Sequence, residues 1–138
     1  MRGLRVIVVL VVVGCGGGPP QPTASPTAAP PPSRDAKAEV CSIAQDATDA
    51  LLKEILAMLE SRGAGQMQAT LDATARANEI ARETVEKLRN GQEDDPDISE
   101  FAFRVLDIQS LTASLDWTPN QLSNAGTELV GATAELDC

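Results

Sequence analysis

The residue types in this chain restrict the chemistry that it can perform. It has no His and three Cys, and its 20 Asp and Glu residues outnumber its 11 Lys and Arg residues. The lack of His excludes Ser-His-Asp and Cys-His catalysis, and three Cys do not complete the usual four-ligand zinc site. The acidic excess argues against binding of nucleic acid, whose phosphates require positive charge. We therefore expect no metal or other cofactor, and the three thiols become the groups of interest.

The first thiol, Cys15, follows a short apolar segment. Arg2 and Arg5 precede an uninterrupted apolar run over residues 6–13, and Gly14 stands directly before Cys15. A helix of eight residues rises only about 12 Å, which is too short for a hydrocarbon core of about 30 Å. The segment is therefore typical of a cleaved secretory signal peptide rather than of a membrane span.

The residues Val12-Val13-Gly14-Cys15 resemble the lipobox of bacterial lipoproteins. This resemblance covers residues 1 to about 34. It implies that residues 1–14 are a signal peptide, that the thiol of Cys15 carries diacylglycerol, and that the new amino terminus is acylated. Two or three acyl chains anchor a protein stably, whereas one chain does not. The resemblance therefore implies a lipid anchor on the extracytoplasmic face of the cell membrane.

Residues 16–34, which follow the lipidated Cys15, are rich in Pro, Gly, Ser and Thr. They present no apolar face, and proline cannot donate the hydrogen bonds of helices and sheets. We predict a disordered, extended tether of up to about 60 Å. The chain thus divides into a signal peptide (1–14), a lipidated tether (15–34) and a folded domain (35–138).

The folded domain contains four segments in which apolar residues recur every three or four positions, as in amphipathic helices. We predict the first two helices at about residues 36–61 and 66–89. Asp95-Pro96 and Thr118-Pro119 each place an N-cap residue before a proline, which predicts the starts of the third and fourth helices. No segment after the tether alternates with the period of a strand, so the domain is predicted to be all-α. The predicted core positions are Val40, Ala44, Ala47, Leu51, Ile55 and Met58; Met67, Leu71, Thr74, Ala81, Val85 and Leu88; Ile98, Phe101, Ala102, Val105, Ile108, Thr112 and Leu115; and Leu122, Ala125, Gly126, Leu129, Thr133 and Leu136. Leu52, Leu56 and Leu59 widen the stripe of the first helix near its end.

Short connections make successive helices antiparallel neighbours, which predicts an up-down-up-down four-helix bundle. The start of the first helix and the end of the fourth then lie at the same pole. Cys41 and Cys138 occupy these two places and, with Cys15 lipidated, are the only pair left in an oxidising compartment. We predict a disulfide between them, with a free thiol or an intermolecular bridge as the alternatives.

Asn78 lies within the apolar stripe of the second predicted helix. A buried amide requires hydrogen-bond partners. The simpler interpretation is a hydrogen bond between helices that fixes their register. The alternative is a polar core site to which Thr74 and Thr133 also contribute.

Phe103 points about 160° away from the apolar stripe of the third predicted helix. Together with Leu106 it is a candidate contact surface for a partner protein. The alternative is that a loop or the first helix covers it.

Charged residues form two further patterns. Residues 93–100 contain five carboxylates, a composition that suits Ca²⁺, but Ile98 and Arg104 stand where an EF-hand requires Gly and Glu. We interpret this segment as a solvated helix cap whose charges offset the helix dipole. The alternating charges from Arg76 to Arg89 are interpreted as an exposed helix face with weak ion pairs.

The sequence contains no pair of nucleophile and base, so an enzyme is the least favoured class. We expect a non-enzymatic interaction or accessory module of the bacterial cell envelope, held by its lipid anchor and bound to a protein partner. The alternative is a carrier of a small or lipidic ligand in the bundle core.

Overall fold

The computed structural model describes residues 34–89 and 95–138. The predicted signal peptide, Cys15, the tether up to residue 33 and residues 90–94 lie outside the described residues. The described part forms four helices, α1 (Arg34–Gly63), α2 (Met67–Arg89), α3 (Pro96–Ser114) and α4 (Pro119–Glu135), and it contains no strand. This confirms the predicted all-α class. None of these four helices is both long enough and apolar enough to cross a membrane.

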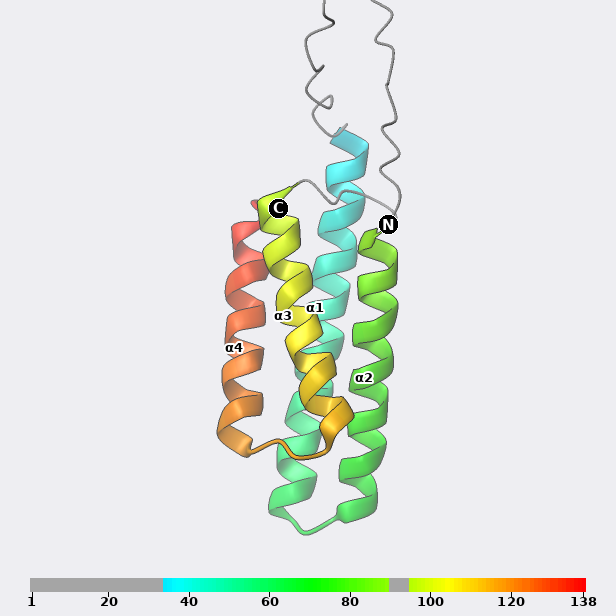
Figure 1. Ribbon diagram of the computed structural model, residues 1–138, viewed down its shortest axis with the longest axis vertical. Helices are drawn as coiled ribbons and strands as arrows, with labels where there is room; N and C mark the ends of the chain where they lie inside the picture. The colour runs from blue at the N-terminus through cyan, green and yellow to red at the C-terminus, as the bar shows by residue number, and fades with distance from the viewer. Residues whose placement is uncertain (1–33, 90–94) are drawn as a thin grey trace, which may run out of the picture. The chain divides into compact units, whose positions relative to one another are not determined.

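The helices form an antiparallel up-down-up-down bundle (Figure 1), as predicted. Helix α1 packs against α2 and α4, and α3 packs against the same two helices, so the four form a closed ring. The bundle therefore has two poles. We call the end that holds the α1–α2 and α3–α4 turns the turn pole. The opposite end, where α1 starts and α4 finishes, is the disulfide pole.

The starts of α3 and α4 are set by local hydrogen bonds at the predicted cap residues. The side chain of Asp95 accepts hydrogen bonds from the amides of Asp97, at 2.9 Å, and Ile98, at 3.4 Å. Thr118 and Gln121 form a capping box in which each side chain bonds the backbone of the other residue. Each cap satisfies amides that would otherwise lack partners in the first helical turn.

The core lies along the axis of the bundle and contains all six residues predicted for the narrow stripe of α1. Of the residues predicted to widen that stripe, Leu56 is 59% exposed. On α2 the buried face consists of three alanines, three threonines, Val85 and Leu88, so most of its side chains are small. On α4 a Cβ atom added at Gly126 would lie 3.4 Å from the ends of the Ile55 and Leu52 side chains, so glycine lets α4 approach α1. The largest fully buried side chains are Phe101, Leu51, Met58, Ile108, Leu122, Leu129 and Val105.

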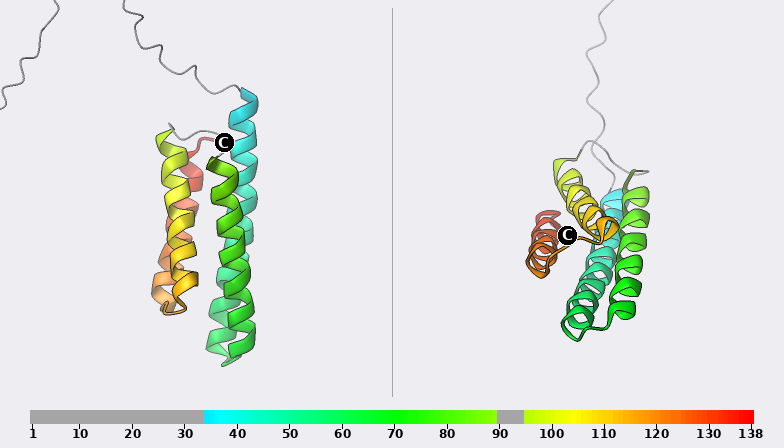
Figure 2. Two further views of the ribbon diagram at one scale, coloured as in Figure 1. Left: turned by 45° about the vertical axis from the view of Figure 1, so that its right-hand side comes forward. Right: turned by 60° about the horizontal axis from the view of Figure 1, so that its bottom comes forward.

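Three further predicted core residues are exposed, and all three lie at the turn pole. Met67 is 70% exposed, Leu71 38% and Leu115 57%. Helices α1 and α2 have 30 and 23 residues, whereas α3 and α4 have only 19 and 17. The α1–α2 hairpin therefore extends beyond the α3–α4 turn (Figure 2), which leaves the start of α2 without a covering helix. The prediction was wrong here because periodicity does not reveal where a covering helix ends.

Candidate functional site

Cys41 and Cys138 form a disulfide, with an S–S distance of 2.04 Å and a Cα–Cα distance of 5.7 Å. They are separated by 97 positions in the sequence. The bond joins the start of α1 to the end of the chain beyond α4 and confirms the predicted pairing. It closes the bundle at the pole where α1 starts.

Phe103 and Leu106 lie on the outer side of α3 and are 52% and 39% exposed, so neither a loop nor α1 covers them. Leu106 contributes to a shallow cavity of about 160 Å³ between α2 and α3, which Val85 and Leu88 also line. Arg104 lies 5.4 Å from the ring centroid of Phe103. The exposure of this pair agrees with the prediction, and its role as a partner contact stays a prediction.

The three residues of the predicted polar core site lie in separate environments. Asn78 donates hydrogen bonds to the carbonyl oxygen of Gln109, at 3.1 Å, and to the hydroxyl of Thr112, at 3.2 Å, so it links α2 to α3. Thr133 shares a hydrogen bond of 2.7 Å with Thr48 of α1. Thr74 donates to the carbonyl oxygen of Thr70, within α2. No hydrogen bond joins these three residues to one another. The contacts therefore favour the simpler interpretation, in which Asn78 bonds a neighbouring helix and fixes its register.

In the acidic segment, Asp95 caps α3, while Glu93 and Asp94 lie outside the described residues. Within residues 34–89 and 95–138, no group of three or more His, Cys, Asp or Glu side chains is arranged to hold a metal ion. In the described part of the segment, Asp95 bonds backbone amides of α3, and Glu100 pairs with Arg104.

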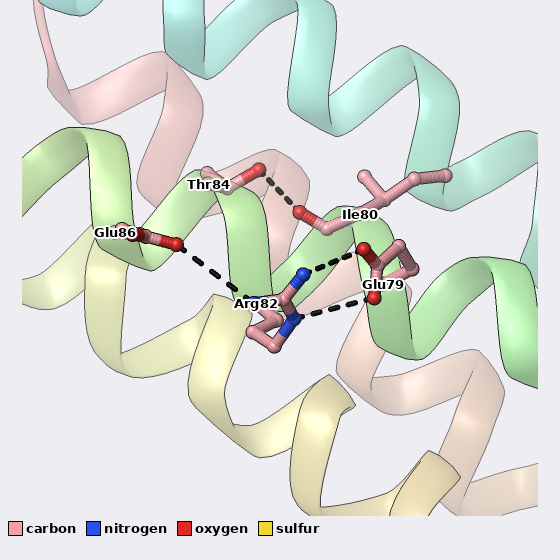
Figure 3. Close-up of polar contacts among 5 residues, drawn as sticks. All are labelled: Glu79, Ile80, Arg82, Thr84 and Glu86. Atoms are coloured by element: carbon pink, nitrogen blue, oxygen red, sulfur yellow. Dashed lines mark hydrogen bonds and ion pairs between the residues drawn. The ribbon is translucent and has the colours of Figure 1, made fainter.

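The charged face of α2 is exposed, with Arg82 between Glu79 and Glu86 (Figure 3). Hydrogen bonds from Arg82 and its positive charge lower the pKa of Glu79. The same pair raises the pKa of Arg82. Arg76 does not follow the predicted pattern, because it bonds Glu54 of α1 at 2.9 Å and so ties two helices together. The pairs of Arg82 with Glu79 and Glu86 are exposed on both sides and contribute little to stability. Glu54, by contrast, is only 8% exposed.

A pocket of about 340 Å³ opens at the turn pole, where sequence analysis predicted no site. Its walls include the three exposed apolar residues Met67, Leu71 and Leu115, together with Trp117, which is only 3% exposed. They come from the start of α2 and from the α3–α4 turn. The other residues that line it are Arg62, Gly65, Thr70 and Thr74.

Arg62 is the charged group of this pocket. Its guanidinium lies 4.5 Å from the centroid of the Trp117 ring, and its Nη1 donates a hydrogen bond of 2.5 Å to the carbonyl oxygen of Trp117. No carboxylate lies within ion-pair distance of Arg62 among the described residues. By contrast, the guanidinium of Arg104 contacts three carboxylates, and a hydrogen bond to Glu100 raises its pKa.

The two buried hydroxyls of the pocket are already satisfied. Thr70 donates to the carbonyl oxygen of Gln66, at 3.0 Å, and shares a hydrogen bond of 2.8 Å with Ser61. Thr74 is bonded to the backbone one helical turn earlier, at 2.7 Å. The pocket is therefore apolar and contains one charged group, Arg62. This arrangement suits the binding of a ligand, whereas acid–base catalysis would require a paired acid and base. One feature of the sequence could have indicated this pocket: the only Trp of the chain stands directly before the predicted helix start at Thr118-Pro119.

These features define an antiparallel four-helix bundle closed by a disulfide, with an apolar pocket at its opposite pole. Comparison of the chain with protein-family models, with curated proteins and with solved structures found no match.

Proposed function

We propose that this chain is a lipid-anchored protein on the extracytoplasmic face of a bacterial cell membrane, whose helical bundle is a non-enzymatic interaction module. The observation that carries the anchor is the resemblance of Val12-Val13-Gly14-Cys15 to a lipobox. The disulfide supports it, because Cys41 and Cys138 pair with each other and leave Cys15 as the thiol to be acylated. Disulfides also persist in exported proteins, which agrees with a signal peptide.

The anchor is tested by expressing the full chain in a bacterial host fed with an alkyne-labelled fatty acid. We expect wild type to carry the label and to sediment with membranes. Cys15→Ser is expected to lose the label and to leave the membrane fraction. The control is the double variant Cys41→Ser/Cys138→Ser, which should keep the label. Labelling of Cys15→Ser equal to that of wild type would overturn the anchor.

The interaction role is supported by the exposed apolar surface of α3. Phe103 and Leu106 lie three positions apart, which places them next to each other on one side of the helix. Exposed aromatic and aliphatic side chains of this kind are typical of protein contact surfaces.

A photo-crosslinking amino acid placed at residue 103 or 106 tests this role in intact cells. We expect one discrete crosslinked product at both positions. A matched control at Glu83, which is exposed on α2, should not give that product. Identical products at all three positions, or no product at any of them, would contradict the proposed surface.

The second candidate, a carrier of a small or lipidic ligand, is favoured by one specific observation. The bundle axis is occupied by fully buried side chains such as Leu51, Phe101 and Leu129. An apolar pocket of 340 Å³ opens instead at the turn pole. A ligand site would therefore be terminal rather than central.

A further inference from the structure

We infer that the turn-pole pocket binds a small amphipathic anion, with its apolar chain against Met67, Leu71 and Leu115 and its anionic group on Arg62. This inference goes beyond the interaction role proposed above and does not depend on the lipid anchor. It rests on the size of the pocket, its lining, the state of Arg62 and the conformation of Leu115.

The size and lining of the pocket match a small apolar ligand. Its volume of 340 Å³ lies at the lower end of the range for small-molecule sites. It is roughly twice the volume of an apolar cavity that accepts benzene. Met67 and Leu71 are exposed although they belong to the apolar stripe of α2, so a ligand would bury surface that the fold leaves in water.

Arg62 supplies the charge complementarity that selects an anion. A guanidinium has five N–H donors, and in Arg62 only Nη1 has a hydrogen-bond partner among the described residues. The Trp117 ring and the Trp117 carbonyl oxygen hold the group in place, so little side-chain entropy is lost when an anion binds. Nε and Nη2 are left to form the paired hydrogen bonds that carboxylates and phosphates accept.

The backbone at Leu115 gives an independent reason to regard the pocket as a built site. Leu115 ends α3 with φ of 55°, a left-handed conformation that favours Gly or Asn over Leu. Its side chain is 57% exposed, so burial does not compensate for this cost. An unfavourable backbone conformation that holds an exposed apolar side chain against a pocket is typical of a functional site.

The test uses the full-length chain with Cys15→Ser, so that no acyl chain competes for the pocket. The ligand probes are decanoate, 1-decanol and decyltrimethylammonium, which share one chain and differ in head-group charge. Trp117 is the only Trp, and the chain has no Tyr, so its fluorescence reports on the pocket directly. Calorimetric titration at physiological salt gives the affinity without relying on the fluorophore.

We expect saturable binding of decanoate, and binding of decyltrimethylammonium at least about tenfold weaker, because a hydrogen bond to a charged group is worth about a factor of ten or more. Arg62→Gln should reduce decanoate affinity to that of decanol, while Arg62→Lys should keep part of the preference. The matched control is Arg89→Gln, which makes the same change beside the small α2–α3 cavity and should bind decanoate like the parent chain. Met67→Ser, at an exposed position that leaves the core intact, should weaken decanoate and decanol alike.

Three results would overturn the inference. One is the absence of saturable binding by any of the three compounds. Another is equal affinity of the parent chain and a folded Arg62→Gln variant for decanoate. The third is a concentration-dependent dimer, measured by ultracentrifugation, that Met67→Ser disperses, because the pocket would then belong to a second copy of the chain.

Discussion

Arg62 and Trp117 join the two turns at one pole of the bundle. The guanidinium lies 4.5 Å from the ring centroid and donates a hydrogen bond to the Trp117 carbonyl oxygen, although 55 positions separate the two residues. This contact therefore ties the α1–α2 hairpin to the α3–α4 turn. Removal of the Trp117 side chain should therefore destabilise the bundle.

We expect Trp117→Ala to lower the free energy of unfolding by about 3 kcal/mol, because it removes a large side chain that is only 3% exposed. Urea unfolding followed by far-UV circular dichroism measures the change without a Trp signal. Trp117→Phe, which keeps most of the apolar volume, should cost less. Equal stability of wild type and Trp117→Ala would mean that the α3–α4 turn does not depend on this ring.

The disulfide closes a loop of 97 positions, so its removal should destabilise the bundle strongly. In the chain-entropy model a loop of this length contributes about 4 to 5 kcal/mol, and measured values are often smaller. Thermal unfolding of Cys41→Ser/Cys138→Ser should show a large decrease in Tm. A reductant should lower the Tm of wild type but not that of the double variant. Identical Tm values for wild type and variant would contradict a stabilising role for the bond.

Leu115→Gly should stabilise the domain by about 1 kcal/mol, because glycine adopts a positive φ without the steric cost that Leu incurs. The exposed side chain loses little burial when it is removed. Leu115→Ala is the control, because alanine has the same steric conflict at a positive φ as Leu and should not stabilise the domain. The same Leu115→Gly variant should bind decanoate more weakly, so stability and binding are expected to change in opposite directions.

The Asn78 amide bonds Thr112 and Gln109, so its truncation should remove two hydrogen bonds between α2 and α3. We expect Asn78→Ala to cost about 1 to 2 kcal/mol. A double-mutant cycle with Thr112→Val isolates the shared hydrogen bond, and a coupling of about 0.5 kcal/mol or more is expected. Strict additivity of the two substitutions would show that this bond adds nothing to stability.

The exposed pair of Glu79 and Arg82 gives a small pH dependence with a defined sign. Arg82 lowers the pKa of Glu79, so the folded state favours the charged carboxylate. The stabilisation is present above the unfolded pKa and is lost as the pH falls through the lower, folded pKa. A carboxyl NMR titration should find the Glu79 pKa below its ordinary value of 4.5 in wild type and closer to that value in Arg82→Gln. An unchanged pKa in the variant would rule out Arg82 as the cause.

The starts of α3 and α4 could be read from the sequence because their causes are local. Asp95 and Thr118 bond amides within three positions, and the prolines that follow them suit the first helical position. The pairing of Cys41 with Cys138 followed from helix number and direction, together with the assignment of Cys15 to the lipid anchor in an exported protein. The buried stripe of α1 was also predictable, because other helices cover it along its length.

Tertiary structure alone decided which apolar residues at the turn pole are covered. Met67 and Leu71 satisfy the helical periodicity, yet they are exposed because α3 and α4 are shorter than α1 and α2. Leu115 is exposed where α3 ends in a left-handed conformation. The contact of Arg62 with Trp117 depends on two distant turns meeting, which no short-range pattern encodes. Hydrogen bonds within one helical turn determine where helices begin, whereas the lengths and packing of several helices determine where a pocket forms.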